Sequence, residues 1–147
     1  MLDVSLGEEI GNGLDEVVYG VFENNLDAVW PKVLPILTKA LDRDADYSPQ
    51  DIYSQVKNYE SQLMVCERAG APEFVLVTSI VHVKNKKACS LFLAAGENAR
   101  HWISYLGSVE NWARQSGCDS IRLSGRPGWQ KLLKDYRLKD IVLEKSL

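Results

Sequence analysis

Residues 74–83 read FVLVTSIVHV, a long run of apolar and β-branched side chains that is typical of a buried strand. The polar residues KNKK at 84–87 predict a hairpin turn after it, and CSLFL at 89–93 predicts the returning strand. In the other direction, LMVC at 63–66 followed by the turn-forming residues AGAP at 69–72 predicts a strand that precedes it. We therefore expect three antiparallel strands joined by short turns.

A helical pattern fills the residues between a short predicted strand at 17–22 and this meander. Apolar residues recur every three or four positions from 26 to 41, which predicts an amphipathic helix. Pro31 suits the first turn of such a helix, and Pro35 predicts either a kink or the true start of the helix.

A second helix is predicted to begin after Ser48. Ser48 is a favourable N-cap, it is followed by a proline, and Asp51 stands at the third helical position. Its buried face is expected to hold Ile52, Val56 and Tyr59.

The residues after the meander predict a long helix, a strand, a short helix and a last strand. The helix has one apolar face and ends at Gly117. That face consists of Trp102, Tyr105, Leu106, Val109, Trp112 and Ala113. The later elements are expected at 120–123, 129–136 and 141–144.

The element order is therefore β-α-α-β-β-β-α-β-α-β, and the fold class is α/β (α+β). A helix between the fourth and fifth strands normally joins parallel neighbours. We thus expect a mixed, mostly antiparallel sheet with one parallel pair. Such a pair separates at its strand ends and leaves a slot beside the N-terminus of the connecting helix.

Composition narrows the class of protein. The 147 residues are 46% hydrophobic and 25% charged, which is typical of a globular chain. No apolar run approaches the roughly 20 residues of a membrane-spanning helix, and no signal peptide is visible at the N-terminus. The net charge of −3 gives no sign of nucleic-acid binding. Cys66, Cys89 and Cys118 are widely spaced, which favours buried thiols over a disulfide framework or a metal site.

Charge separates an acidic N-terminal arm, residues 1–16, from a single domain at 17–147. Seven acidic residues and no Lys or Arg fall within the first 31 positions. Residues 1–16 also contain four apolar side chains, Leu2, Val4, Leu6 and Ile10. Three interpretations stay open: the arm docks on a neighbouring protein, it folds back as an edge strand of its own domain, or it is a solvated acidic tail.

The element order over 17–147 resembles the GNAT superfamily of N-acyltransferases. That resemblance implies a GNAT-like fold in which the helix after the fourth strand carries the acyl-CoA site. Three short sequences, GCD at 117–119, GRPGW at 125–129 and VLEK at 142–145, are similar to small GNAT-like proteins of tailed bacteriophages and prophages. This second resemblance implies a phage or prophage protein.

The resemblance places cofactor binding at Gly96, Glu97, Asn98, Ala99 and Arg100. GNAT enzymes hold the diphosphate of acyl-CoA on backbone amides at this helix start, with two glycines that allow close approach. Here one glycine remains, and Glu97 stands where the helix N-terminus would accept an anion. We expect its carboxylate to occupy those amides and to repel a diphosphate.

Residues for catalysis and for partner binding follow from the same resemblance. If the protein is an enzyme, Tyr136 is the candidate general acid, and Glu67 and His82 are the candidate bases. Structural roles for all three remain open. Arg126 and Trp129, in and beside a glycine-flanked loop, are candidate partner contacts.

Two functions are compatible with these patterns. The main interpretation is a bacteriophage protein with a degenerate GNAT-like fold, which serves as a virion or assembly component without acyltransferase activity. It would need no cofactor, would bind other phage proteins or itself, and would lie in the virion or the host cytoplasm. The alternative is an N-acetyltransferase that uses acetyl-CoA and acts on an unknown amine.

Overall fold

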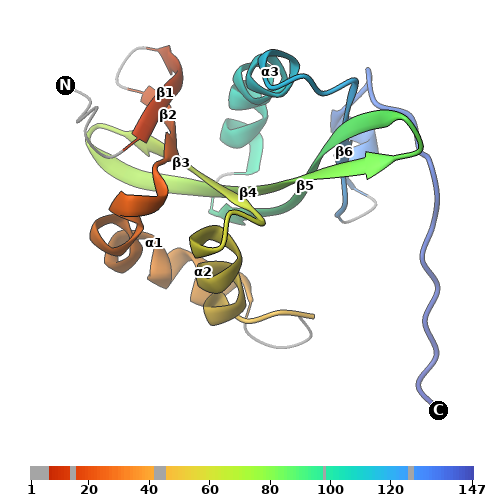
Figure 1. The fold of residues 1–147 in the computed structure, drawn as a ribbon, viewed down its shortest axis with the longest axis horizontal. Helices are drawn as coiled ribbons and strands as arrows, with labels where there is room; N and C mark the ends of the chain where they lie inside the picture. The colour runs from red at the N-terminus through yellow and green to blue at the C-terminus, as the bar shows by residue number, and fades with distance from the viewer. Residues whose placement is uncertain (1–6, 14–15, 42–45, 98, 126–127) are drawn as a thin grey trace.

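The computed structural model describes residues 7–13, 16–41, 46–97, 99–125 and 128–147 (Figure 1). Its centre is one six-stranded sheet with the spatial order β1-β2-β3-β4-β5-β6. The strands are β1 (Gly7–Gly13), β2 (Glu16–Val21), β3 (Gln62–Arg68), β4 (Ala71–Val83), β5 (Lys86–Gly96) and β6 (Ser120–Leu123). The helices are η1 (Glu23–Asn25), α1 (Leu26–Ala40), α2 (Pro49–Lys57), α3 (Ala99–Gln115) and α4 (Trp129–Leu132).

Strand pairing confirms the predicted fold class. All neighbours from β1 to β5 pair antiparallel, and only β5 and β6 pair parallel. The turn between β3 and β4 has positive φ at Ala69 and Gly70, the backbone form that matches the twist of a tight hairpin. α3 connects the two parallel strands, as expected for a crossover.

Helices cover both faces of the sheet, with α1 and α2 on one face and α3 on the other (Figure 1). Strand residues alternate between these faces, so two apolar cores form. The core under α1 and α2 includes Val65, Val75 and Val77 of the sheet. The core under α3 includes Met64, Leu76 and Leu91. On α3, Tyr105, Leu106, Val109 and Ala113 are buried as predicted, and the side chain of Trp102 lies outside the described residues.

α1 begins at Leu26, so Pro31 does not lie in the first turn and Pro35 does not mark the start of the helix; the alternative prediction, a kink at Pro35, stays a prediction. Pro31 and Pro35 both lie in the interior of the helix and on its exposed face. A proline removes one backbone hydrogen bond and leaves a carbonyl four residues earlier without its usual donor. On the exposed face water can bind that carbonyl, while Val29, Val33 and Leu37 stay buried on the opposite face.

α2 begins with a complete capping box, as predicted. Ser48 Oγ accepts a hydrogen bond from the Asp51 amide, and Asp51 accepts one from the Ser48 amide. Ile52 and Val56 are buried, but Tyr59 is not, because the helix ends at Lys57. Tyr59 adopts φ 62°, is 75% exposed, and donates its hydroxyl to Glu23 Oε2 at 3.0 Å.

The two ends of the chain differ from the predicted element order. β1 lies within the predicted acidic arm and pairs with β2, which is the edge-strand alternative for those residues. Residues 141–144, predicted as the last strand, form none, because no neighbouring strand lies beside them in the described structure. Among the described residues, no helix is long and apolar enough to cross a membrane.

Candidate active site

A groove opens where β5 and β6 separate. The last pair between these strands joins Leu91 to Leu123, and β5 continues five residues farther, to Gly96. Parallel neighbours in a twisted sheet separate readily when one of them ends. The groove has a volume of about 1050 Å³. Its lining comes from the end of α1, the residues on both sides of the β3–β4 turn, the last residues of β5, and four residues at and after the end of β6: Leu123, Ser124, Gly125 and Trp129. This is the slot that the parallel pair predicted.

A bulge in β5 lies at the start of this groove. Val77 pairs with Leu93 and Thr78 pairs with Leu91, so Phe92 is left between them without a partner on β4. Tyr47, in the segment before α2, donates its hydroxyl to the carbonyl oxygen of Phe92 at 3.1 Å. The two rings also meet edge to face, with centroids 5.6 Å apart. Tyr47 therefore holds the bulge from the face that α1 and α2 cover.

Trp129 forms part of the wall of the groove. Its ring lies so close to Gly125 that a Cβ on this glycine would sit 2.7 Å from Trp129 Cδ1. Only glycine allows that approach without displacing the ring. Trp129 is half-buried and packs against the α3 core, so the wall is anchored on both sides.

Charged side chains gather at the end of the groove. Arg68 pairs with Glu16 of β2, and its Nε lies 3.3 Å from Glu73 Oε2. Farther toward solvent, Lys39 Nζ of α1 lies 2.6 Å from Glu97 Oε1, just after β5. The hydrogen bond from Lys39 lowers the pKa of Glu97 and raises that of Lys39, so both groups stay charged at neutral pH.

The predicted cofactor residues are only partly described. Gly96 ends β5, and Gly96 and Glu97 both line the groove. Ala99 and Arg100 begin α3, but their side chains, like the whole of Asn98, lie outside the described residues. Glu97 contacts Lys39, a pairing that the sequence did not suggest, and its contact with the amides of α3 stays a prediction.

The predicted catalytic residues are not brought together. Glu67 is half-buried beside the β3–β4 turn and pairs with Pro72. His82 is exposed at the far end of β4, where it pairs with Lys87. Tyr136 lies beyond α4, and its hydroxyl donates to Glu110 Oε2 at 2.6 Å. None of these three lines the groove. Burial and the hydrogen bond to Glu110 raise the pKa of Tyr136, so its hydroxyl stays protonated.

The other predicted positions have mixed outcomes. Arg126 lies outside the described residues, and Trp129 lines the groove, so their roles in partner binding stay predictions. Cys66 and Cys89 are buried as expected, whereas Cys118 is half-buried. Four residues in or beside the groove were not predicted from the sequence: Tyr47, Lys39, Arg68 and Glu73. Their distance in sequence from β5 gave no signal of a shared site.

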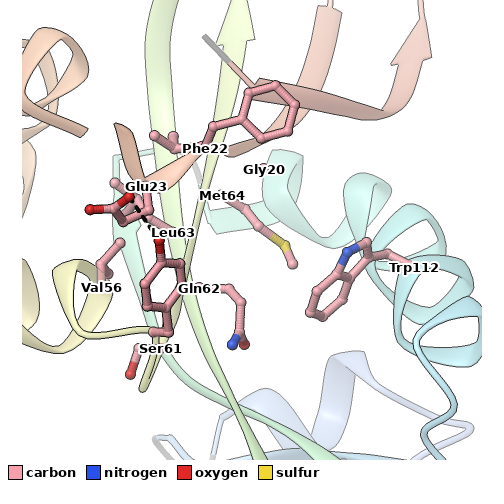
Figure 2. A pocket seen from close by; sticks show the side chains of 11 residues that line it. Gly20, Phe22, Glu23, Val56, Ser61, Gln62, Leu63, Met64 and Trp112 are labelled. Carbon is pink, nitrogen blue, oxygen red and sulfur yellow. Dashed lines mark hydrogen bonds between the residues drawn. The ribbon is translucent and has the colours of Figure 1, made fainter. Parts of the chain in front are cut away.

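A smaller hollow of about 250 Å³ lies at the opposite end of β3 (Figure 2). It opens where β2 turns away toward η1, and Met64 of β3 and Trp112 of α3 line one side of it. Its acidic group, Glu23, accepts the Tyr59 hydroxyl, as the dashed line in Figure 2 shows. None of the predicted site residues that the structure describes lines this hollow, so the groove beside β5 is the better candidate site.

Comparison with solved structures shows the fold of GNAT acetyltransferases. An aminoglycoside acetyltransferase from an uncultured soil metagenomic sample, in complex with sisomicin, superposes with a TM-score of 0.67 at 8% identity, covering 90% of this chain and 97% of the other. A GNAT family acetyltransferase from Staphylococcus aureus superposes with a TM-score of 0.65 at 11% identity, covering 91% of this chain and 100% of the other. A ribosomal-protein-alanine N-acetyltransferase from Brucella melitensis biovar Abortus superposes with a TM-score of 0.65 at 6% identity, covering 89% of this chain and 99% of the other. No protein-family model matches the chain, and no curated protein matches it.

These comparisons correct the main functional interpretation. The prediction of a phage structural component without acyltransferase activity is wrong, because the structural neighbours are aminoglycoside and ribosomal-protein acetyltransferases. The predicted resemblance to phage proteins and the predicted virion location find no support among them. The neighbours fit the alternative interpretation, an acetyltransferase, better than the main one.

Proposed function

We propose that this protein is an N-acetyltransferase that transfers an acetyl group from acetyl-CoA to an amine. The observation that carries the proposal is the groove at the separation of β5 and β6, within a fold shared with acetyltransferases. The substrates named for those neighbours, an aminoglycoside and a ribosomal-protein alanine, differ widely in size. The fold therefore leaves the acceptor of this chain open.

The groove fits the extended, amide-bearing arm of acetyl-CoA. Beyond Leu91, β5 has no strand on its β6 side among the described residues, so backbone groups on that side are available to a ligand. An exposed strand edge binds an extended chain through such groups. At the end of β5, Lys39 provides a positive charge for phosphate, although Glu97 competes for it.

Acetyl-CoA, when bound, supplies an acetyl group activated as a thioester. The chain's own residues position and shield the reacting groups. Tyr47 fixes the Phe92 carbonyl and with it the path of the β5 edge. Leu93, Leu123 and Trp129 make the walls apolar and exclude water, which favours transfer to an amine over hydrolysis.

Attack requires the acceptor amine to be unprotonated. Glu67, His82 and Tyr136 do not line the groove, so we assign to none of them the removal of the proton from the acceptor ammonium group. We infer that the ammonium proton leaves to solvent at the exposed end of the groove, where Lys39 and Glu97 lie. The C–N bond then forms as the thioester C–S bond breaks, and the proton released by the new amide nitrogen neutralises the CoA thiolate. Activity is then expected to rise with pH until the acceptor amine is fully deprotonated, with the profile following the pKa of the amine that is used.

Calorimetric titration with acetyl-CoA tests the proposal directly. We expect saturable binding with one site per chain, and acetylation of at least one amine from a panel of aminoglycosides, polyamines and peptides with free N-termini, detected by mass spectrometry. Replacing Gly125 with Leu should displace Trp129 and weaken binding, whereas Gly128→Leu, where a Cβ meets no neighbour, is the matched control. Absence of acetyl-CoA binding to the folded, unmodified protein would contradict the proposal.

A further inference from the structure

The hollow of about 250 Å³ at the start of β3 lies at a second separation within the sheet. The last pair between β2 and β3 joins Gly20 to Met64. Beyond it, Val21 pairs with β1, whereas Gln62 and Leu63 pair with β4. Successive residues of a strand direct their backbone N–H and C=O groups to opposite edges. Either Gln62 or Leu63 therefore presents these groups toward the hollow, where no described strand pairs with them.

The side chains around the hollow combine apolar surface with one negative charge. Phe22, Met64 and Trp112 provide two aromatic rings and a thioether. Figure 2 shows Met64 and Trp112 on one side, Glu23 on the other, and Gln62 between them. Glu23 is the one charged side chain among the described residues that line the hollow. A carboxylate together with aromatic rings favours an organic cation as the ligand.

The Glu23 carboxylate has one oxygen available to such a cation. Its Oε2 accepts the Tyr59 hydroxyl at 3.0 Å. Its Oε1 lies 3.9 Å from Lys57 Nζ, which is beyond hydrogen-bonding distance, and Lys57 instead donates to Asp27 at 3.3 Å. A ligand ammonium at Oε1 could approach to about 2.7–2.9 Å and form a charge-assisted hydrogen bond. Because the Glu23 side chain is only 27% exposed, water screens that bond less than it would on an open surface.

Tyr59 stands at a position where glycine is usual. The Glu60 amide donates to the Gln55 carbonyl at 2.8 Å, and the Tyr59 amide donates to the Val56 carbonyl at 3.2 Å. This pair of bonds is the Schellman end of a helix, whose left-handed residue is most often glycine. Tyr59 adopts φ 62° there at a cost that glycine would not have. Its ring is 75% exposed and adds little to the cores, so we ascribe the ring to a contact with a ligand in the hollow that it lines.

We propose that the hollow binds a primary alkylammonium ion. The ammonium group donates to Glu23 Oε1 and to a backbone carbonyl of β3, the Tyr59 ring lies beside it, and the alkyl stem packs against Met64 and Trp112. The volume is below the ~300–1,000 Å³ of sites for drug-sized ligands, so the stem is short. A free alkylamine and the side chain of a lysine in a peptide both present this group. The hollow and the groove beside β5 share no lining residue, so the proposal is independent of acetyl-CoA binding.

Titration of the full chain with n-butylammonium, followed by two-dimensional NMR, tests the proposal. The indole N–H of Trp112 and the amides of Gln62 and Leu63 should shift saturably. Butanol and butyrate have the same stem without the positive charge and should give no saturable shift at the same concentrations. Lysine blocked at both backbone ends, compared with its Nε-acetylated form, tests the peptide source: tighter binding than n-butylammonium indicates a lysine side chain, and weaker binding indicates a free amine.

Variants separate the charge, the ring and the fold. Glu23→Gln should weaken n-butylammonium binding by about tenfold or more, whereas Glu60→Gln, at an exposed acid that does not line the hollow, is the matched control. Tyr59→Gly removes the ring and relieves the backbone, so affinity should fall while the melting temperature does not. Lys57→Met removes a competing cation and should tighten binding.

Gly125→Leu, which alters the groove beside β5, should leave n-butylammonium binding unchanged. Loss of binding in that variant would place the amine in the groove and would overturn the proposal. Absence of a saturable shift with n-butylammonium would overturn it as well. So would equal binding of butanol, or full affinity in Glu23→Gln, because the carboxylate would then contribute nothing.

Discussion

The Tyr47 hydroxyl donates a hydrogen bond of 3.1 Å to the carbonyl oxygen of Phe92, the residue that bulges out of β5. This bond joins residues 45 positions apart and ties the segment before α2 to the point where the groove begins. At the bulge the residue pairing between β4 and β5 shifts by one position. By holding the bulge, Tyr47 supports the geometry of the candidate site.

Replacing Tyr47 with Phe tests this support. The variant keeps the ring contact and loses the hydrogen bond, so we expect a loss of about 0.5–1.5 kcal/mol in the free energy of unfolding. We also expect a higher KM for acetyl-CoA, because the β5 edge is less well held. Tyr59→Phe is the control, since it removes a hydroxyl bond far from the groove. Equal KM values for the two variants would argue against a role for Tyr47 in the site.

The contact between Lys39 and Glu97 predicts a competition at the end of the groove. Because Glu97 holds the ammonium that an anion would need, Glu97→Gln should tighten acetyl-CoA binding, and Lys39→Met should weaken it. Both side chains are largely exposed, so little change in thermal stability is expected. Titration calorimetry at low and high salt measures the effect. Asp27→Asn, which disturbs an exposed pair with Lys57 away from the groove, should leave affinity unchanged.

β1 packs against α3 through Gly11, and this contact gives a third prediction. A Cβ at position 11 would sit 2.7 Å from the Cβ of Ser108, so one of the two elements must shift. Gly11→Ala should therefore lower the melting temperature of the isolated protein. Gly107→Ala, where a Cβ meets no neighbour, is the control. An unchanged melting temperature in Gly11→Ala would show that β1 contributes little to the domain.

Buried acidic groups predict a loss of stability at high pH. Burial raises the pKa of Cys89 from 9.0 to about 11, and that of Tyr105 from 10.0 to about 12. As pH rises above 9.0, the unfolded chain loses the Cys89 proton first, so it binds fewer protons than the folded chain and unfolding becomes easier. The contribution of Cys89 is complete below pH 9.0 and is lost as pH approaches about 11.

Denaturant unfolding across this window measures the slope of stability against pH. Cys89→Ala should flatten the part of the slope between pH 9.0 and about 11. Cys118→Ala is the comparison: it removes only the smaller, coulombic cause of the raised Cys89 pKa and should retain most of this slope. An identical slope in both variants would mean that Cys89 does not contribute.

Much of the fold was predictable because its signals are local. The runs at 63–66, 74–83 and 89–93 have strand composition, and the spacing from Tyr105 to Ala113 has the helical period. The capping box at Ser48 was predictable for the same reason, since it involves residues three apart. The boundaries of α1 were not, because whether a proline is tolerated depends on which face of the helix meets solvent.

The candidate site was predictable in place but not in composition. A helix after a strand, followed by another strand, predicts a parallel pair and a slot at its ends, and the groove lies there. The residues that line it come from distant segments. Arg68 and Glu73 flank a turn, and Lys39 ends a helix, so no motif joins them to Glu97 in the sequence.

Between Glu16 and Leu132 the sequence by itself determined the order of strands and helices, the antiparallel meander and the parallel pair, because each depends on periodicity and turn chemistry within a few residues. Only the tertiary structure decided that Gly7–Gly13 joins the sheet and that residues 141–144 do not. A strand needs a partner as well as a composition, and partners are chosen by the folded chain. The Tyr47–Phe92 and Lys39–Glu97 contacts likewise depend on how α1 and α2 pack over β5, which no local pattern records.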